Sequence, residues 1–232
     1  MPPALSVHSV SDNTFPPTAH LVRGATLATI AYAIFIASDP FLTYELSWEG
    51  VNYSRQDSQG TRGTITFGGG GLVGVFLDDN SPRAPWHAAT PYSLETVLAG
   101  MPPDVRAVAD TGALQYLWDD QWASTPVATT AFWSAGDHLT AAQPWPDVLE
   151  HGGHLVATEC LAPLEGLEAW RDDCEFSPAQ TLLMRSLFER VTARTEGVIV
   201  LTDDERRVLT AAGQDGLADS RAMLAAVGIV LP

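Results

Sequence analysis

Two histidines and two cysteines are the residues whose types and spacing come nearest to a metal site. His151 and His154 are separated by two glycines, and Cys160 and Cys174 follow along the chain. Zinc prefers four tetrahedral histidine and cysteine ligands, usually anchored by a close pair. However, the cysteines form no Cys-x-x-Cys pair, and the glycines do not fix both histidines on one rigid element. We therefore predict ordinary histidines at the end of a helix, buried thiols, no metal and no cofactor.

A cysteine nucleophile is the second chemistry to consider. Cys160 follows Glu159, and three histidines (His138, His151 and His154) lie nearby in the sequence. Cysteine catalysis needs a thiolate stabilised by a positioned histidine, and sequence spacing alone does not supply that arrangement. The chain contains no G-x-S-x-G, H-E-x-x-H or G-x-G-x-x-G motif. The sequence therefore assigns no catalytic residue and favours a protein that is not an enzyme.

Tryptophans and aspartates in the middle of the chain are the best candidates for a binding surface. All seven tryptophans except Trp48 lie beyond residue 85. Together with carboxylates, such side chains can line a sugar-binding or cation-binding cleft. The simpler interpretation is that they fill a core between short helices. The candidate partner-binding or ligand-binding residues are Asp78, Asp79, Arg83, Trp86, Trp118, Asp119, Asp120 and Trp122.

The charge composition narrows the classes of partner. The 28 acidic residues outnumber the 12 basic ones and give a formal net charge of −16. Such a balance disfavours nucleic acids and anionic membranes, which are recognised by clustered basic residues. All the basic residues are arginine, which excludes a catalytic or Schiff-base lysine. A basic protein partner fits this charge, although solubility alone also explains it. With only two cysteines, the simplest prediction is a cytoplasmic protein.

A short stretch near the end of the chain resembles part of a known family. The run Leu201-Thr202-Asp203-Asp204-Glu205-Arg206-Arg207-Val208-Leu209, with Leu217 to Ile229 as a second helix, resembles the opening of the helix-turn-helix domain of LuxR-type regulators. The resemblance covers about thirty residues and implies a capped helix pair. The recognition helix of that family would follow where the sequence stops at Pro232, and its phosphate-contacting basic residues are missing. We expect no regulatory function from it.

Residues 41–79 predict the sheet that organises the fold. Alternation from Leu42 to Trp48 is typical of a half-buried strand. Glu49-Gly50 then fits a tight turn that would place Trp48 opposite Val51. Two more strands, over residues 61–67 and 72–77, follow after turn-forming segments. Because every connection is short, we predict a four-stranded antiparallel meander.

The remaining segments are predicted to be mainly helical. Residues 1–17 are rich in proline and form a loose leader, and Ala19 to Ala37 forms a buried apolar helix. Secretion through this segment as a signal peptide is the minor alternative. Helices are expected over residues 93–100, 104–109, 113–118, from Thr125 toward Gly136, and after residue 177, with one strand over residues 198–201. Capping boxes are expected to begin two of the later helices, at Ser177 with Gln180 and at Thr202 with Glu205. A domain boundary could fall near residues 81–92.

These observations predict an α+β fold with an N-terminal helix, a four-stranded antiparallel meander and a mainly helical second half, in one domain over residues 18–232. The function that fits best is a non-enzymatic, acidic recognition or inhibitor protein of the bacterial immunity type, which binds a basic protein partner. The alternative is a hydrolase, or a sugar-binding or cation-binding protein, with its site in the tryptophan-rich second half. The oligomeric state stays open.

Overall fold

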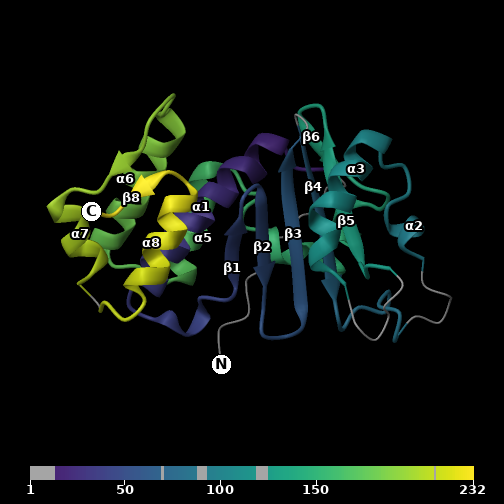
Figure 1. Cartoon of the computed structure of the whole chain (residues 1–232), viewed down its shortest axis with the longest axis horizontal. Coiled ribbons are helices and arrows are strands. Elements are labelled where there is room, and N and C mark those ends of the chain that lie inside the picture. Colours follow the sequence, from purple (N-terminus) through teal and green to yellow (C-terminus); the bar gives the residue numbers. More distant parts are fainter. Residues whose placement is uncertain (1–13, 69–70, 88–92, 119–124, 212) are drawn as a thin grey trace.

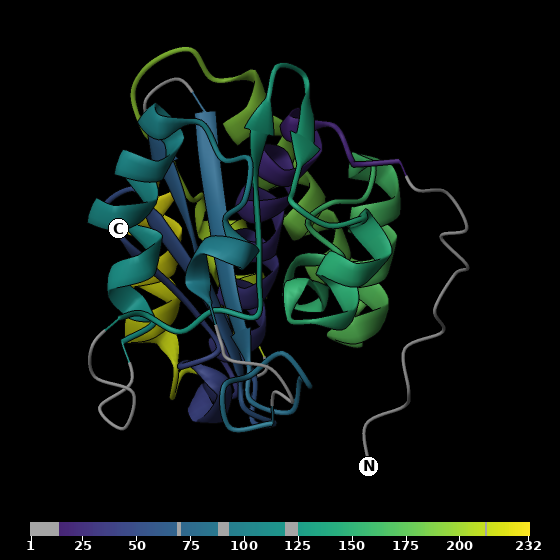
Figure 2. The ribbon, with the colours of Figure 1, turned by 90° about the vertical axis from the view of Figure 1, so that its right-hand side faces the viewer.

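The computed structural model of this chain describes residues 14–68, 71–87, 93–118, 125–211 and 213–232. Its centre is a six-stranded antiparallel sheet in which the strands follow one another in sequence order. Helices cover both faces of this sheet (Figures 1 and 2). The predicted α+β class is therefore confirmed, but the sheet has six strands rather than four. The strands are β1 (Leu46–Glu49), β2 (Asn52–Gln56), β3 (Thr61–Gly68), β4 (Gly71–Asp78), β5 (Thr130–Ala135) and β6 (His138–Thr140).

The β1–β2 hairpin turns one residue later than predicted. Glu49 pairs with Asn52, so the turn consists of Gly50 and Val51. Gly50 has a φ of +58°, which the first position of such a two-residue turn requires and which glycine adopts without strain. The predicted pairing of Trp48 with Val51 was therefore wrong. The first strand also starts later than predicted, because a short 3₁₀ helix, η1 (Pro40–Leu42), precedes it.

The first of the two extra strands, β5, replaces a predicted helix. We expected a helix from Thr125 toward Gly136, but β5 runs antiparallel to β4 there. The side chains of Phe132 and Trp133 are both buried, on opposite faces of the sheet. A strand that is buried on both faces favours aromatic and β-branched residues. This explains why the segment does not form an amphipathic helix. Gly136 then turns the chain into β6 with a φ of +62°.

The apolar N-terminal helix α1 (Thr18–Ile36) lies behind the sheet, between it and the last helices of the chain (Figure 1). It contacts α5 (Pro163–Asp173), α6 (Pro178–Ala193) and α8 (Leu217–Ala226). Its length and composition are also those of a membrane-crossing helix, but 67% of its most apolar stretch is buried inside the protein. Trp48 of β1 connects α1 to the sheet, because its Nε1 donates a hydrogen bond to Thr29 Oγ1 at 2.9 Å.

A second, smaller core lies on the opposite, front face of the sheet. Its helical cover consists of α2 (Leu94–Val97), α3 (Pro103–Thr111) and the 3₁₀ helix η2 (Ala113–Tyr116). These elements pack over the valines of β4 and over Ala131 and Trp133 of β5. In Figure 1, α3 stands in front of β4 and β5, α2 lies to their right, and no helix stands in front of β2. The front faces of the first strands are thus left to polar side chains.

The remaining elements complete the back layer and the helical end of the molecule. They are α4 (Trp145–Glu150), η3 (Gly153–Val156), β7 (Ile199–Val200), α7 (Asp203–Leu209) and β8 (Ile229–Val230). Capping boxes begin α6, at Ser177 with Gln180, and α7, at Thr202 with Glu205, as the sequence predicts. The predicted late strand is present as β7 and pairs in parallel with β8, a strand that the sequence did not indicate.

The segment just before α1 covers the β6 edge of the sheet. Leu139 donates a backbone hydrogen bond to Pro16 O at 2.9 Å, and Thr18 donates one to Asp137 O at 2.8 Å. The ring of Phe15 packs against Trp145 at 5.9 Å between centroids. The end of the predicted leader therefore contacts the fold, whereas residues 1–13 of that leader lie outside the described residues.

Candidate functional site

The bare front face of the first strands forms an open, polar depression beside η2. Its volume is about 220 Å³. We call it the sheet-face site and define it by the residues that line it. They are Tyr44, Ser47, Glu49, Ser54, Arg55, Gln56, Arg62, Gly63, Thr64, Tyr116 and Leu117. The floor comes from alternate residues of β1, β2 and β3, because successive side chains of a strand point to opposite faces.

A chain of hydrogen bonds runs from β3 and β2 to this site and ends on a carboxylate of its lining. Thr66 Oγ1 donates to Asn52 Oδ1 at 2.7 Å, and Asn52 Nδ2 donates to the hydroxyl of Tyr116 at 3.2 Å. Tyr116 in turn donates to Glu49 Oε2 at 2.6 Å. This last hydrogen bond raises the pKa of Tyr116, so the phenol stays protonated and remains a donor. Every bond in the chain points toward Glu49.

Four of the predicted binding residues lie together at the end of β4, and each is engaged with the protein. Asp78 accepts a hydrogen bond from the backbone of Asn80, and Asp79 forms an ion pair with Arg62 at 3.3 Å. Arg83 lies 3.2 Å from Asp147 of α4, and Trp86 Nε1 donates to the carbonyl of Asp79 at 2.8 Å. Their contacts stabilise the loop that follows β4.

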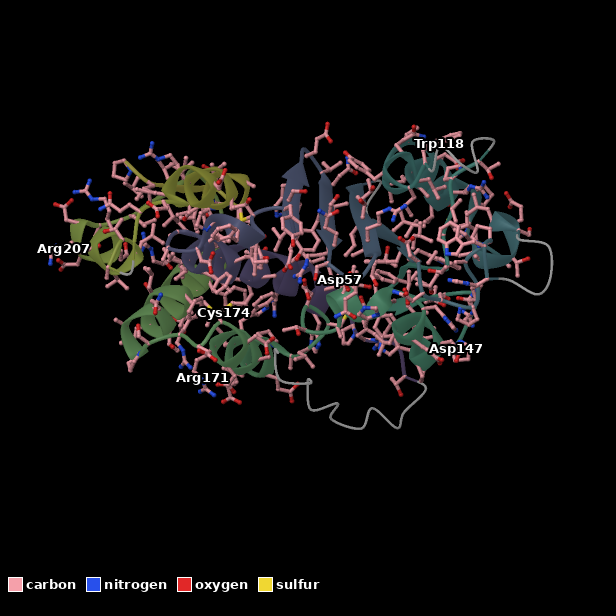
Figure 3. The ribbon with its side chains drawn as sticks, turned by 90° about the horizontal axis from the view of Figure 1, so that it is seen from below. Asp57, Trp118, Asp147, Arg171, Cys174 and Arg207 are labelled. Carbon is pink, nitrogen blue, oxygen red and sulfur yellow. The ribbon has the colours of Figure 1, made fainter. Side chains whose placement is uncertain are left out.

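The other predicted residues of this group are only partly described. The side chain of Trp118 is 49% exposed and directly follows two residues of the sheet-face site, at the front of the molecule (Figure 3). Asp119, Asp120 and Trp122 lie outside the described residues. The buried tryptophans are divided between the two cores, with Trp133 on the front face and Trp145 and Trp170 on the back. The described tryptophans therefore do not line one common cleft.

The predicted metal candidates are separated in the structure. His151 and Cys160 are buried, whereas His154 is exposed, 3.9 Å from Asp57. Cys174 lies in the helical half, away from Asp57 and Asp147 (Figure 3). Within the ranges that the structure describes, no three histidine, cysteine or acidic side chains are placed to hold a metal ion.

The histidine at the back of β4 forms a buried pair with a serine. Ser81 Oγ and His151 Nδ1 are 2.9 Å apart, and Ser81 Oγ also accepts the backbone N–H of Arg83 at 3.1 Å. Either atom of the pair can be the donor, depending on the tautomer of His151. Burial, followed by the charge of Arg83, lowers the pKa of His151. Since Ser81 and His151 are only 2% and 8% exposed, a substrate would not reach this pair.

The sequence analysis missed a buried ionic cluster between the sheet and α5. Glu159 Oε1 accepts hydrogen bonds from Tyr53 and from Arg55, both at 2.7 Å. The guanidinium of Arg55 lies 5.5 Å from the ring centre of Trp170 and 5.9 Å from that of Tyr32. Burial, and then the Glu159 charge, raise the pKa of Tyr53 well above its ordinary value. The alternation of β2 placed Tyr53 and Arg55 on one face, but no local signal indicated Glu159 as their partner.

No protein-family model, curated protein or solved structure matches this chain. The function is therefore inferred from the geometry of the sites alone.

Proposed function

We propose that this chain is a non-enzymatic recognition protein, of the kind represented by bacterial immunity proteins, and that it binds a basic protein partner. The sheet-face site is the proposed contact surface. The observation that carries the proposal is the oriented carboxylate of Glu49, on a polar sheet face that the helices of the front layer leave bare. A carboxylate held in place in this way gives a basic partner a fixed acceptor without the entropic cost of ordering it.

The size of the site favours a macromolecular partner over a small molecule. Small-molecule pockets usually enclose about 300–1,000 Å³. The sheet-face site has about 220 Å³ and is open to solvent. Its floor of serine, threonine and glutamine side chains offers donors and acceptors over an extended area rather than a deep apolar cavity. The formal net charge of −16 would also speed the approach of a basic protein.

A second candidate function, binding of a sugar or an organic cation by a hydrolase or binding protein, has narrower support. Tyr44, Tyr116 and Trp118 are 47%, 36% and 49% exposed at or next to the sheet-face site. Exposed aromatic rings beside a carboxylate suit sugars and organic cations. Native mass spectrometry of the purified protein separates the two functions, because a retained small molecule would add its own mass to the chain.

Capture of the partner from the native host tests the main proposal. The immobilised wild type would be compared with Ser47→Arg, which adds a bulky cation to the floor, and with Thr195→Arg. Thr195 is exposed beyond α6 and receives the same change in charge. We expect a basic protein to be retained at 0.15 M salt by the wild type and Thr195→Arg, and lost with Ser47→Arg. If no basic protein is retained, or if all three proteins retain it equally, the proposal is wrong.

A further inference from the structure

The sheet-face site contains one acceptor that is set apart from its other polar groups. Most polar side chains of the floor bond to one another or to nearby backbone; Ser54 and Thr64, for example, share a hydrogen bond of 2.8 Å, and Gln56 donates to the carbonyl of Tyr44 at 2.9 Å. Glu49 differs because it is exposed and receives a hydrogen bond at Oε2 only. Its Oε1 atom has no protein partner among the described residues.

The hydrogen-bond chain fixes the direction in which this carboxylate points. Thr66 is buried, and it lies against Gly112, where a β-carbon would overlap the threonine side chain. The chain therefore begins at a closely packed position and runs through Asn52 and Tyr116 to Glu49. Because Asn52 donates to the hydroxyl oxygen of Tyr116, that hydroxyl uses its own proton for the bond to Glu49. Glu49 is held with one oxygen turned away from Tyr116.

We propose that Glu49 is the point at which the sheet-face site takes up the cationic side chain of a partner, with arginine as the preferred residue. This inference rests on the proposed function and names the chemistry of the partner at that site. A guanidinium can donate to Glu49 Oε1 while its flat face lies on an exposed tyrosine ring, and both contacts favour arginine. The two tyrosines of the site, Tyr44 and Tyr116, are 47% and 36% exposed.

Among the described residues, the ion pairs around the sheet-face site leave one negative charge without a cation. Arg62 lines the same site, but its guanidinium lies 3.3 Å from Asp79, which balances its charge. The second arginine of the lining, Arg55, forms its ion pair with the buried Glu159 on the back of the sheet. Glu49 has no such counter-ion among the described residues, so within them its charge is not balanced at this face.

Nuclear magnetic resonance titration with N-acetyl-arginine N-methylamide, a single blocked arginine, tests this inference. We expect backbone amide shifts to cluster in the β1–β2 hairpin and around η2. Glu49→Gln keeps the acceptor for Tyr116 but removes the charge, and it should weaken binding at least fivefold. Tyr116→Phe should weaken it by a smaller factor, because the charge remains but is no longer oriented. Glu189→Gln, an equal change of charge at an exposed position of α6, should leave the affinity unchanged.

Three outcomes would overturn the inference: shifts spread over the whole acidic surface, equal binding of N-acetyl-glycine N-methylamide, or equal losses in Glu49→Gln and Glu189→Gln. The capture experiment and the arginine titration test separate claims, and either can fail without the other. If a basic protein is captured but its affinity is unaffected by Glu49→Gln, the proposed function holds and this inference is wrong. If the arginine probe binds at Glu49 and no protein is captured, the inference holds for a guanidinium ligand and the proposed function is wrong.

Discussion

The guanidinium of Arg55 lies 2.7 Å from the carboxylate of Glu159, a residue 104 positions further along the chain. The Glu159 side chain is only 1% exposed and also accepts the hydroxyl proton of Tyr53. This contact joins the second strand of the sheet to the segment that precedes α5. It therefore connects the sheet to the helical layer behind it at a point that contains two charges and little water.

Removal of the buried carboxylate should be costly. Glu159→Ala leaves Arg55 charged and without its ion-pair partner, and breaking such a buried pair typically costs about 3–5 kcal/mol of unfolding free energy. Urea unfolding at pH 7 would measure this loss. Asp204→Ala, which removes an exposed partner of Arg207, is the control and should change the free energy little. Equal effects of the two substitutions would show that the Arg55–Glu159 pair does not stabilise the fold.

Substitution of a glycine in α1 by alanine should destabilise the fold. A methyl group at Gly24 would overlap the backbone carbonyl of Glu159, which has no side-chain freedom to move aside. We expect Gly24→Ala to lower the free energy of unfolding by about 1–3 kcal/mol, despite the higher helix propensity of alanine. Gly166→Ala in α5 is the matched control, since its methyl would meet only the end of Leu27 at 3.2 Å. Thermal unfolding of both variants checks the difference between them.

Stability should fall with pH below about 6.5 through His151. Because burial and Arg83 lower the pKa of this histidine in the folded state, the unfolded chain binds a proton at a higher pH than the folded protein does. The contribution of His151 is therefore complete above the unfolded pKa and is lost as the pH falls through the folded one. Urea unfolding at pH 7.5 and pH 5.5 should show a smaller loss in His151→Asn than in the wild type. An equal loss in both proteins would contradict this assignment.

Both thiols should react slowly in the folded protein. Burial raises the pKa of Cys160 well above its ordinary value and that of Cys174 to about 12. Because the thiolate is the reactive form, alkylation of Cys174 at pH 8 should be slower by roughly a thousandfold than in the urea-unfolded chain. Cys160 is the more deeply buried thiol and should react after Cys174. Mass spectrometry of iodoacetamide-treated protein would follow both sites, and rapid labelling of either would show that its thiol is not enclosed.

Local patterns predicted the elements whose signals are complete within a few residues. The strands predicted over residues 61–67 and 72–77 and the capping boxes at Ser177 and Thr202 are examples, and the structure has these strands and both capping boxes. The segment of β5 was predicted as a helix because Thr125-Pro126 is typical of a helix start. Its burial on both faces depends on β4 and on two separate cores, which no neighbouring residue indicates.

The candidate site was predictable only in part. The sequence predicted Glu49 in the turn after the first strand, and it gave no sign that η2 would bring Tyr116 beside it from 67 positions away. The Arg55–Glu159 pair has the same origin in long-range packing. Asp78, Asp79, Arg83 and Trp86, which were predicted as binding residues, lie together because they follow one another in a single loop. Their contacts with the protein itself, such as that of Arg83 with Asp147, were not foreseeable from the loop.

The position of α1 has a consequence for how this protein is made in the cell. α1 leaves the ribosome before α5, α6 and α8, the helices that cover it, because all three follow it in the chain. Until these helices have been synthesised, a nascent chain therefore carries an uncovered apolar helix, the kind of segment that chaperones and proteases recognise. A message truncated before α8 would yield a chain with its most apolar helix only partly enclosed. Release of a stable product thus depends on completion of the C-terminal helices.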